Sequence, residues 1–338
     1  MLSGYGTWVR LSVLHRENDM KNCLIIADFL SEDNKRMMKA AAEEHGYSAL
    51  FYNDTEAAAE DLPGAEILYT ADYRAVLKAS EIKWCHTPYA GADKLISTGI
   101  FDSGDVILTN SSGAYGRAIS EYIIMASLML MKQMPEYRKI TDERGWVQDI
   151  PTRSIAGSRI AVIGTGDIGC NAAVRFKALG ADTVAGFNRS GRPVDCFDRT
   201  YPLNDFADNA EDTDVLVMCV PGTPETEGLL SAELISCLPK KALIINVGRG
   251  TAVDQDALIS ALNEGRIAGA MLDVVMPEPL PADHPLWTAK NCIVTPHIAG
   301  DMSLPYTVDL TVEFFCENLK RYAEGGPMLH RVDVKAGY

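Results

Sequence analysis

The sequence lacks the features that would place it in a membrane or on a nucleic acid. It contains no run of roughly 20 apolar residues that could span a bilayer, and residues 1–19 lack the apolar core of a signal peptide. Lys and Arg total 31 against 46 Asp and Glu, which gives a formal charge of −15. Nucleic acids and anionic membranes are bound by basic faces. We therefore expect neither as a partner.

Cysteine is present eight times, but always singly and without a CxxC motif. Some cysteines lie inside apolar runs, as Cys219 does in VLVMCVP, where a free thiol packs as a small hydrophobic group. This usage predicts free thiols and a cytoplasmic protein. The histidines show no metal-ligand spacing, so we expect no bound metal.

The chain length of 338 residues favours two domains. From Lys21 to about Ser112, short apolar runs (NCLIIAD, SALFYND, EILYT, IKWCHTP and VILTN) predict buried strands, and Ser31 is a plausible N-cap of a helix over residues 31–45. A second series of apolar runs begins after Ser158 with RIAVIG, TVAGFN, DVLVMCVP, ALIINV, IAGAMLDVV and NCIVTPH. Strands this uniformly apolar are typical of a parallel sheet that is covered on both faces.

A final helix, predicted over residues 303–324, follows the second series of strands. We therefore predict an α/β protein with two Rossmann-like, doubly wound parallel-sheet domains, one inserted into the other. Residues 1–20 would be an extension, residues 21–112 and 303–338 the discontinuous domain, and residues 113–302 the inserted domain. A long apolar helix predicted over residues 117–140, before a break at Pro135 and the following WVQDIPT, favours a buried connection or a homodimer interface.

The inserted domain contains a dinucleotide-binding fingerprint. Gly164, Gly166 and Gly169 form G-x-G-x-x-G between the apolar strand RIAVI and an amphipathic helix. The first glycine permits a tight turn, the second lets the backbone approach a pyrophosphate, and the third allows the helix to pack closely on the strand. The helix N-terminus favours the negative charge. The predicted cofactor contacts here are Gly164, Thr165, Gly166, Asp167, Ile168 and Gly169.

The next strand ends without the carboxylate that NAD enzymes use to hold the adenine ribose. Asn188, Arg189 and Ser190 stand there instead, and all three can donate hydrogen bonds to a 2′-phosphate. The sequence therefore predicts NADP as the preferred cofactor over NAD. The alternative is that Arg189 only stacks on adenine and both cofactors bind.

Polar residues follow three later strands at their carboxyl ends, where open α/β sheets bind ligands. Arg249 lies in INVGRGTAVD, Asp273 and Glu278 lie in MLDVVMPEPLP, and His297 lies in VTPHIAG. Together with GTGDIG, CVPGTPETEGLL and HPLW, these runs resemble the D-isomer-specific 2-hydroxyacid dehydrogenase family, which includes glyoxylate/hydroxypyruvate reductases and phosphoglycerate dehydrogenases. The resemblance is strongest from about Asn110 to Gly300.

The resemblance implies an NAD(P)-dependent oxidoreductase that transfers a hydride to C2 of a small 2-oxo acid. Arg249 would bind the substrate carboxylate and polarise its carbonyl. His297 would donate the proton, and Glu278 would orient its imidazole and favour the protonated form. Further cofactor contacts would come from Val220, Pro221, Val247, Asp273 and Gly300, and substrate contacts from Tyr89, Ala90, Gly91 and Ala92.

Some questions stay open. Asp273 could instead be a helix cap or a polar group at the edge of the core, and Tyr115 could cover the site or only pack. Val275 and Tyr89 depart from the family pattern near the substrate, so the particular 2-oxo acid is not specified. A D-3-phosphoglycerate dehydrogenase is one alternative function. A corepressor-like scaffold that binds NAD(H) without turnover is another, although the intact Arg249, Glu278 and His297 favour an enzyme.

Overall fold

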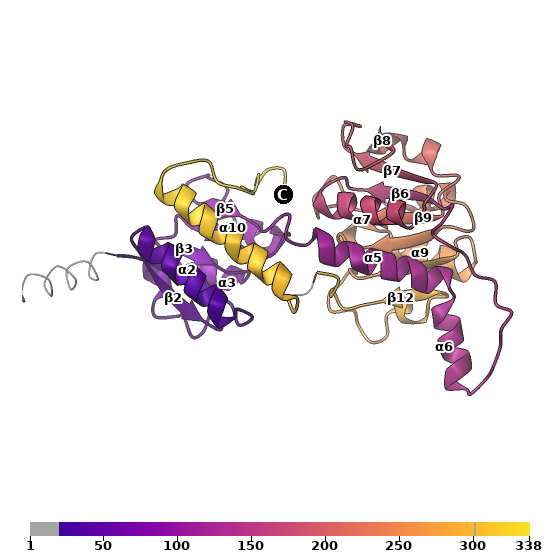
Figure 1. The fold of residues 1–338 in the computed structure, drawn as a ribbon, viewed down its shortest axis with the longest axis horizontal. Helices are drawn as coiled ribbons and strands as arrows, with labels where there is room; N and C mark the ends of the chain where they lie inside the picture. Colours follow the sequence, from indigo (N-terminus) through magenta and orange to yellow (C-terminus); the bar gives the residue numbers. More distant parts are fainter. Residues whose placement is uncertain (1–19, 301) are drawn as a thin grey trace, which may run out of the picture. The chain divides into compact units, whose positions relative to one another are not determined.

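The computed structural model describes residues 20–300 and 302–338. Nearly all of the predicted extension, residues 1–19, lies outside this range. The chain divides into two compact units, of which unit 1 combines the segment ending at Ala114 with Met302–Tyr338, and unit 2 is Tyr115–Asp301. Each unit is built on a parallel sheet (Figure 1). The predicted fold class, two parallel-sheet α/β domains, is confirmed.

The sheet of unit 1 has the strand order β2-β1-β3-β4-β5. Side chains alternate between its two faces, so that Cys23 and Ile25 pack toward α2 and α10, whereas Leu24 packs into a second cluster on the opposite face. Both faces are therefore covered, as the apolar strands predicted. The strands are β1 (Lys21–Ile26), β2 (Tyr47–Tyr52), β3 (Ala65–Tyr69), β4 (Trp84–His86) and β5 (Ile107–Thr109), and the helices are α2 (Glu32–Glu44), η1 (Leu62–Gly64), α3 (Tyr73–Lys78), α4 (Asp93–Ile96) and α10 (Pro305–Ala323).

The first helix of unit 1 begins as the sequence predicted. The Ser31 hydroxyl accepts a hydrogen bond from the Asn34 amide at 3.1 Å, and the Asn34 side chain accepts one from the Ser31 amide at 3.1 Å. This reciprocal pair satisfies two amides at the start of α2. The helix ends before Gly46, whose φ of +83° continues the chain in the left-handed region.

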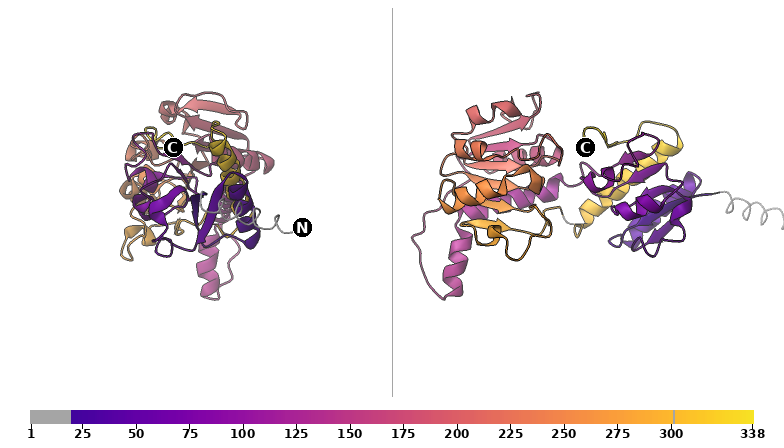
Figure 2. Two further views of the ribbon diagram at one scale, coloured as in Figure 1. Left: turned by 90° about the vertical axis from the view of Figure 1, so that its left-hand side faces the viewer. Right: turned by 180° about the vertical axis from the view of Figure 1, so that it is seen from behind.

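The sheet of unit 2 has the order β12-β11-β10-β9-β6-β7-β8. This order reverses at β6, as in Rossmann domains. Helices α5 and α7 pack together, and α5 also contacts β10 and β11, while α8 and α9 are in contact with each other (Figures 1 and 2). The strands are β6 (Arg159–Ile163), β7 (Thr183–Asn188), β8 (Arg199–Pro202), β9 (Val215–Met218), β10 (Leu243–Asn246), β11 (Gly269–Leu272) and β12 (Cys292–Val294).

The helices of unit 2 connect these strands in chain order. They are α5 (Gly116–Met131), α6 (Met134–Asp142), α7 (Asp167–Ala178), η2 (Leu203–Asp205), η3 (Ala207–Asn209), α8 (Ala232–Cys237), η4 (Gly250–Ala252), α9 (Gln255–Asn263) and η5 (Pro285–Thr288). None of the described helices is both long and apolar enough to cross a membrane.

The long helix predicted over residues 117–140 breaks at Gln133, two residues before the expected break at Pro135. The chain forms α5 and α6 separately, because Gln133 takes a left-handed conformation with φ 56°. Pro135 lies in the first turn of α6, where its missing N–H costs nothing. Much of α5 is buried, whereas α6 has no buried residue.

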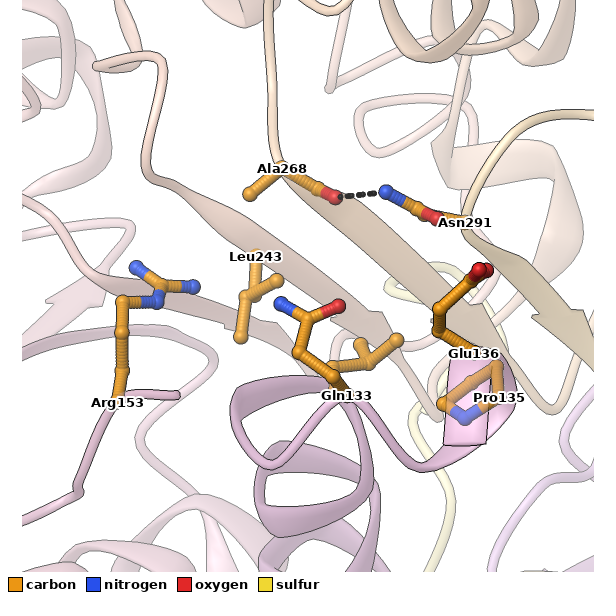
Figure 3. A pocket seen from close by; sticks show the side chains of 8 residues that line it. Gln133, Pro135, Glu136, Arg153, Leu243, Ala268 and Asn291 are labelled. Atoms are coloured by element: carbon orange, nitrogen blue, oxygen red, sulfur yellow. Dashed lines mark hydrogen bonds between the residues drawn. The ribbon is translucent and has the colours of Figure 1, made fainter. Parts of the chain in front are cut away.

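A small pocket lies beside this break (Figure 3). Across it, the Asn291 side chain donates a hydrogen bond to the Ala268 carbonyl at 3.0 Å. Leu243 and Ala268 stand at the amino ends of β10 and β11, the edge of the sheet opposite to the one where α/β folds bind ligands. The pocket is lined by Leu130, Gln133, Pro135, Glu136, Arg153, Leu243, Ala268 and Asn291.

The expectation of eight free thiols is also wrong. Cys170 and Cys196 form a disulfide, with their Cα atoms 5.4 Å apart, a separation typical of disulfides. The other six cysteines are free. The pairing was hidden in the sequence because the two cysteines are 26 positions apart, and only the packing of α7 beside the end of the β7–β8 loop brings them together.

Candidate active site

The fingerprint glycines form a turn between β6 and α7 that no larger residue fits. Gly164 has φ +105°, and a Cβ on it would lie 2.7 Å from the Cys219 carbonyl oxygen. A Cβ on Gly169 would lie 2.0 Å from the Gly164 carbonyl oxygen. These contacts hold the start of α7 against the ends of β6 and β9, where the strand order reverses.

Gly166 differs from its two neighbours because it faces open space. It is the N-cap of α7, has no side-chain cap, and a Cβ on it would meet no atom within 4 Å. The start of α7 therefore has no side chain over its N-cap, and the positive end of the helix dipole lies there. An uncapped helix start with an open glycine is the cradle that a dinucleotide pyrophosphate needs.

The turn after β7 is organised by Asn188. Its side-chain oxygen accepts hydrogen bonds from the amides of Ser190 and Gly191 at 3.1 and 2.7 Å. Its side-chain amide donates to the Thr165 hydroxyl at 3.2 Å and to the Arg192 carbonyl at 3.0 Å. Asn188 thus uses both amide hydrogens within the protein and shapes the turn that carries the exposed Arg189 and Ser190.

Arg249 follows β10 and is half-buried. Its guanidinium donates to the Gly248 carbonyl at 2.8 Å, and the Asn246 side chain donates to the Arg249 carbonyl at 2.9 Å. The next residue, Gly250, lies so close to the backbone of Val275 that a Cβ would be 2.2 Å from the Val275 carbonyl carbon. The Arg249 turn therefore packs directly on the loop that carries Glu278.

Glu278 and His297 are joined by a hydrogen bond. Nδ1 of His297 lies 2.9 Å from Oε2 of Glu278, and the other carboxylate oxygen accepts from the Val275 amide at 3.2 Å. The two side chains are 50% and 40% exposed, so the pair faces solvent rather than the core. The bond fixes the imidazole plane and leaves Nε2 as the ring nitrogen that can meet a ligand.

The backbone at His297 is held in an unusual conformation. Its φ is 56°, which is uncommon for a residue other than glycine. The buried carboxylate of Asp273 accepts hydrogen bonds from the Thr295 hydroxyl at 2.7 Å and from the amides of Ile298 and Ala299, both at 2.8 Å. The His297 amide also donates to the Asp273 carbonyl at 2.9 Å. Asp273 therefore fixes the loop from which His297 projects.

Two supporting residues were not predicted from the sequence. Gln255 accepts from the Met276 amide at 2.9 Å and donates to the Met276 carbonyl at 2.5 Å, which ties the Glu278 loop to α9. Asn246 at the end of β10 also accepts from the Gly248 amide at 3.1 Å and shapes the Arg249 turn. Asn246 could have been predicted, because it is a polar residue at the end of a buried strand. No sequence pattern indicates the role of Gln255.

The predicted substrate loop, residues 89–92, follows β4 in unit 1. The Ala90 carbonyl accepts from the Asn110 side chain at 2.8 Å, and the Tyr89 carbonyl accepts from the Ser111 amide at 3.1 Å. Tyr89 is exposed, whereas Ala92 is buried as the N-cap of α4. Asn110, also missed by the sequence reasoning, thus anchors this loop to the end of β5.

Other predicted positions have simpler surroundings. Val220 and Val247 are buried at the ends of β9 and β10. Tyr115 is only 3% exposed, and a Cβ on Gly300 would lie 3.1 Å from its ring, so Tyr115 packs within unit 2. Among the described residues, no three His, Cys, Asp or Glu side chains form a group that could hold a metal ion.

A Rossmann sheet with this glycine turn and an Arg–Glu–His set at the ends of its strands defines a nicotinamide-dependent oxidoreductase. Residues 124–299 match the family model of the NAD binding domain of D-isomer specific 2-hydroxyacid dehydrogenases. The chain belongs to this family, whose members include oxidoreductases acting on CH–OH donors.

Relatives with assigned activities and solved structures agree. A glyoxylate/hydroxypyruvate reductase A of Photorhabdus laumondii is 27% identical over 277 residues, covering 80% of this chain and 87% of the relative. A family structure from Aeromonas salmonicida has a TM-score of 0.81 at 32% identity, covering 94% of this chain and all of that one. An NADPH-dependent glyoxylate/hydroxypyruvate reductase from Sinorhizobium meliloti, in complex with NADP and sulfate, has a TM-score of 0.79 at 26% identity, with coverages of 94% and 100%.

Proposed function

We propose that the protein reduces a small 2-oxo acid of the glyoxylate or hydroxypyruvate class to the 2-hydroxy acid, with NADPH as the preferred cofactor. The observation that carries this proposal is the bond between Nδ1 of His297 and Glu278, 2.9 Å long, beside the Arg249 turn. The nicotinamide, when bound, supplies the hydride.

His297 is the proton donor in this proposal. Because Glu278 engages Nδ1, the proton reaches the substrate C2 oxygen from Nε2. The Glu278 carboxylate orients the imidazole through Nδ1, and the ring that donates the proton must be an imidazolium before reduction. In the reverse direction, neutral His297 accepts the same proton.

Arg249 binds the substrate carboxylate and polarises the neighbouring carbonyl. A guanidinium is planar and always charged, so it suits a carboxylate. It also supplies local positive charge that an anionic substrate needs on a chain of formal charge −15. We assign the backbone amides of residues 90–92 as additional carboxylate donors and Tyr89 to the substrate side chain.

The preference for NADP rests on the turn after β7. Arg189 and Ser190 are exposed there, with Arg192 close behind, and the carboxylate that would repel a 2′-phosphate is absent. The relatives of known structure include one in complex with NADP and another, from Xanthobacter autotrophicus, in complex with NADPH. Gly164–Gly169, Val220, Pro221, Val247, Asp273 and Gly300 would complete the cofactor contacts.

The test is a substrate panel measured with both cofactors. Absorbance of NADPH and NADH is followed with glyoxylate, hydroxypyruvate, a branched 2-oxo acid and 3-phosphohydroxypyruvate. Turnover of the two small acids with NADPH supports the proposal. A preference for the phosphorylated acid would instead indicate a 3-phosphoglycerate dehydrogenase. Binding of NADPH without turnover of any acid would indicate a scaffold.

We also propose that the enzyme acts in the cytoplasm as a homodimer. The segment after α5 exposes large apolar side chains, with Trp146 89% exposed and Met134 and Val147 about half exposed. Side chains of this kind gather at contacts between subunits. Light scattering of the full chain tests the dimer, and a monomer mass at micromolar concentration would refute it.

A further inference from the structure

The Cys170–Cys196 disulfide joins two parts of the proposed cofactor site. Cys170 follows Gly169 directly and lies in the first turn of α7, whose N-terminus receives the pyrophosphate. Cys196 lies near the end of the loop between β7 and β8, which carries Arg189, Ser190 and Arg192. The bond therefore links the pyrophosphate side of the site to the segment assigned to the 2′-phosphate.

The loop between these points has little regular structure. Residues 189–198 contain no helix or strand. Asn188 fixes the start of the loop, and a salt bridge between Lys177 of α7 and Asp198 fixes its end at 2.7 Å. Between Arg192 and Cys196 few hydrogen bonds hold the loop: the Val194 amide donates to the Thr200 hydroxyl at 3.3 Å, and the Val194 carbonyl accepts from the Phe197 amide at 3.1 Å. The disulfide is therefore the strongest restraint on this part of the loop.

The Cys170–Cys196 pair also differs from five of the six free cysteines, either in burial or in the reactivity of the thiol. Cys170 and Cys196 are half-buried, whereas Cys23 and Cys85 are fully buried. Burial raises the pKa of Cys219, Cys292 and Cys316 to about 12, so their thiols are poor nucleophiles. A thiol reagent thus meets the Cys170–Cys196 pair with little competition from these five cysteines.

We propose that Cys170 and Cys196 are a site of reversible thiol–disulfide exchange that controls affinity for NADP(H). In the oxidised form the loop is preorganised, and Arg189 and Ser190 are held where a 2′-phosphate binds. In the reduced form the segment from Arg192 to Cys196 loses this restraint and must be ordered by the ligand, so the affinity falls. Because NADH lacks the 2′-phosphate, its binding changes less. This inference rests on the proposed role of Arg189 and Ser190.

The exchange needs a dithiol reductant, small or protein-borne. A thiolate of the reductant attacks one sulfur of the pair, the Cys170–Cys196 bond breaks, and a mixed disulfide forms. The second thiol of the reductant then attacks the reductant sulfur of the mixed disulfide, and the protein cysteine leaves as a thiolate. Two electrons and two protons pass to the protein, which gains two thiols, and the reductant becomes a disulfide. Disulfides in a reducing compartment are usually transient or redox-sensing, which agrees with the proposed cytoplasmic location.

The experiment measures cofactor binding by calorimetry on the full chain before and after treatment with dithiothreitol. Mass spectrometry of alkylated peptides establishes the state of Cys170 and Cys196 in each sample. We expect reduction to raise the Kd for NADPH at least threefold and to change the Kd for NADH less than twofold. The variant C170S/C196S should bind as the reduced protein does in both conditions. The matched control Cys237→Ser, on α8, should respond as the wild type does.

Three results would overturn the proposal. They are identical alkylation of the two cysteines before and after reduction, an NADPH affinity that does not change, and a change of equal size for NADH. All three results can be measured on the wild-type protein alone, so the proposal can be tested even if the double variant does not fold. If the oxidised protein binds NADPH no better than NADH, the cofactor preference fails instead. A constant preference in both redox states would refute only the switch.

Discussion

Replacing Asp273 by Asn would disturb the loop that holds His297 with almost no change in side-chain size. The carboxylate is 2% exposed and accepts three hydrogen bonds, two of them from the amides of Ile298 and Ala299. Those two amides donate to different oxygens of the carboxylate. An Asn side chain has a single oxygen, so whichever way it is turned, one of the two amides faces an NH₂ group that cannot accept.

The expected cost follows from these contacts. Hydrogen bonds to a charged acceptor contribute about 1.5–3 kcal/mol each, and an unsatisfied buried N–H adds a desolvation penalty of about 1–3 kcal/mol. Loss of one such bond and weakening of the others predicts that the free energy of unfolding falls by about 2–4 kcal/mol. For a domain of about 150–250 residues, in which 1 kcal/mol shifts Tm by about 2–4 °C, this lowers Tm by about 4–16 °C. A displacement of His297 of about 1 Å would lower kcat about 10²-fold.

Thermal unfolding followed by circular dichroism, together with steady-state kinetics on glyoxylate and NADPH, measures both effects. Asp283→Asn is the matched control, because Asp283 is exposed and lies in the loop before η5; its Tm and kcat should stay near those of the wild type. If Asp273→Asn unfolds within 1 °C of the wild type and keeps its kcat, Asp273 does not fix the catalytic loop, and the reasoning is wrong.

Three further predictions concern Glu278, Arg189 and His86. Glu278→Gln should lower kcat for reduction about 10–10²-fold with little change in the Kd for NADPH, because the imidazolium loses its anionic partner; an unchanged kcat would remove Glu278 from proton transfer. Arg189→Asp should shift the ratio of kcat/KM for NADPH over NADH at least 10-fold toward NADH, and a constant ratio would show that Arg189 does not meet the 2′-phosphate. Burial lowers the pKa of His86 to about 3 from an ordinary 6.5, so the unfolded chain binds a proton that the folded one does not, and stability is lost as pH falls from 6.5 toward 3. Urea unfolding of the wild type and of His86→Gln is measured at pH 6.5, 5.5 and 4.5. Per pH unit, the free energy of unfolding should fall by up to about 1.4 kcal/mol more in the wild type than in the variant. An equal fall in the two proteins would contradict this.

Most strands could be predicted from the sequence because their apolar runs are long enough to indicate burial on both faces. The exception is β8, which reads Arg-Thr-Tyr-Pro and lies at the edge of its sheet. A polar edge strand that ends in proline carries no such signal, since only one of its edges is paired. The break between α5 and α6 was placed too late, because a left-handed Gln133 has no signature comparable to that of Pro135.

The sequence predicted the pairing of Glu278 with His297 but not the residues that support the two loops. Arg249, Glu278 and His297 stood in separate, ordered motifs at strand ends, and the bond between Glu278 and His297 is present in the structure. The three hydrogen bonds of Asp273 depend on how the loop at residues 295–299 folds back over β11, which no local pattern encodes. The same reason explains why Gln255 and the Cys170–Cys196 pairing were missed.

The most direct test of the central claim is His297→Ala, assayed with glyoxylate and NADPH and by calorimetry with NADPH. If the proton reaches C2 oxygen from His297, kcat should fall about 10²–10⁴-fold while the Kd for NADPH stays within about twofold of the wild-type value. A variant that binds NADPH normally and turns over at the wild-type rate would contradict the account.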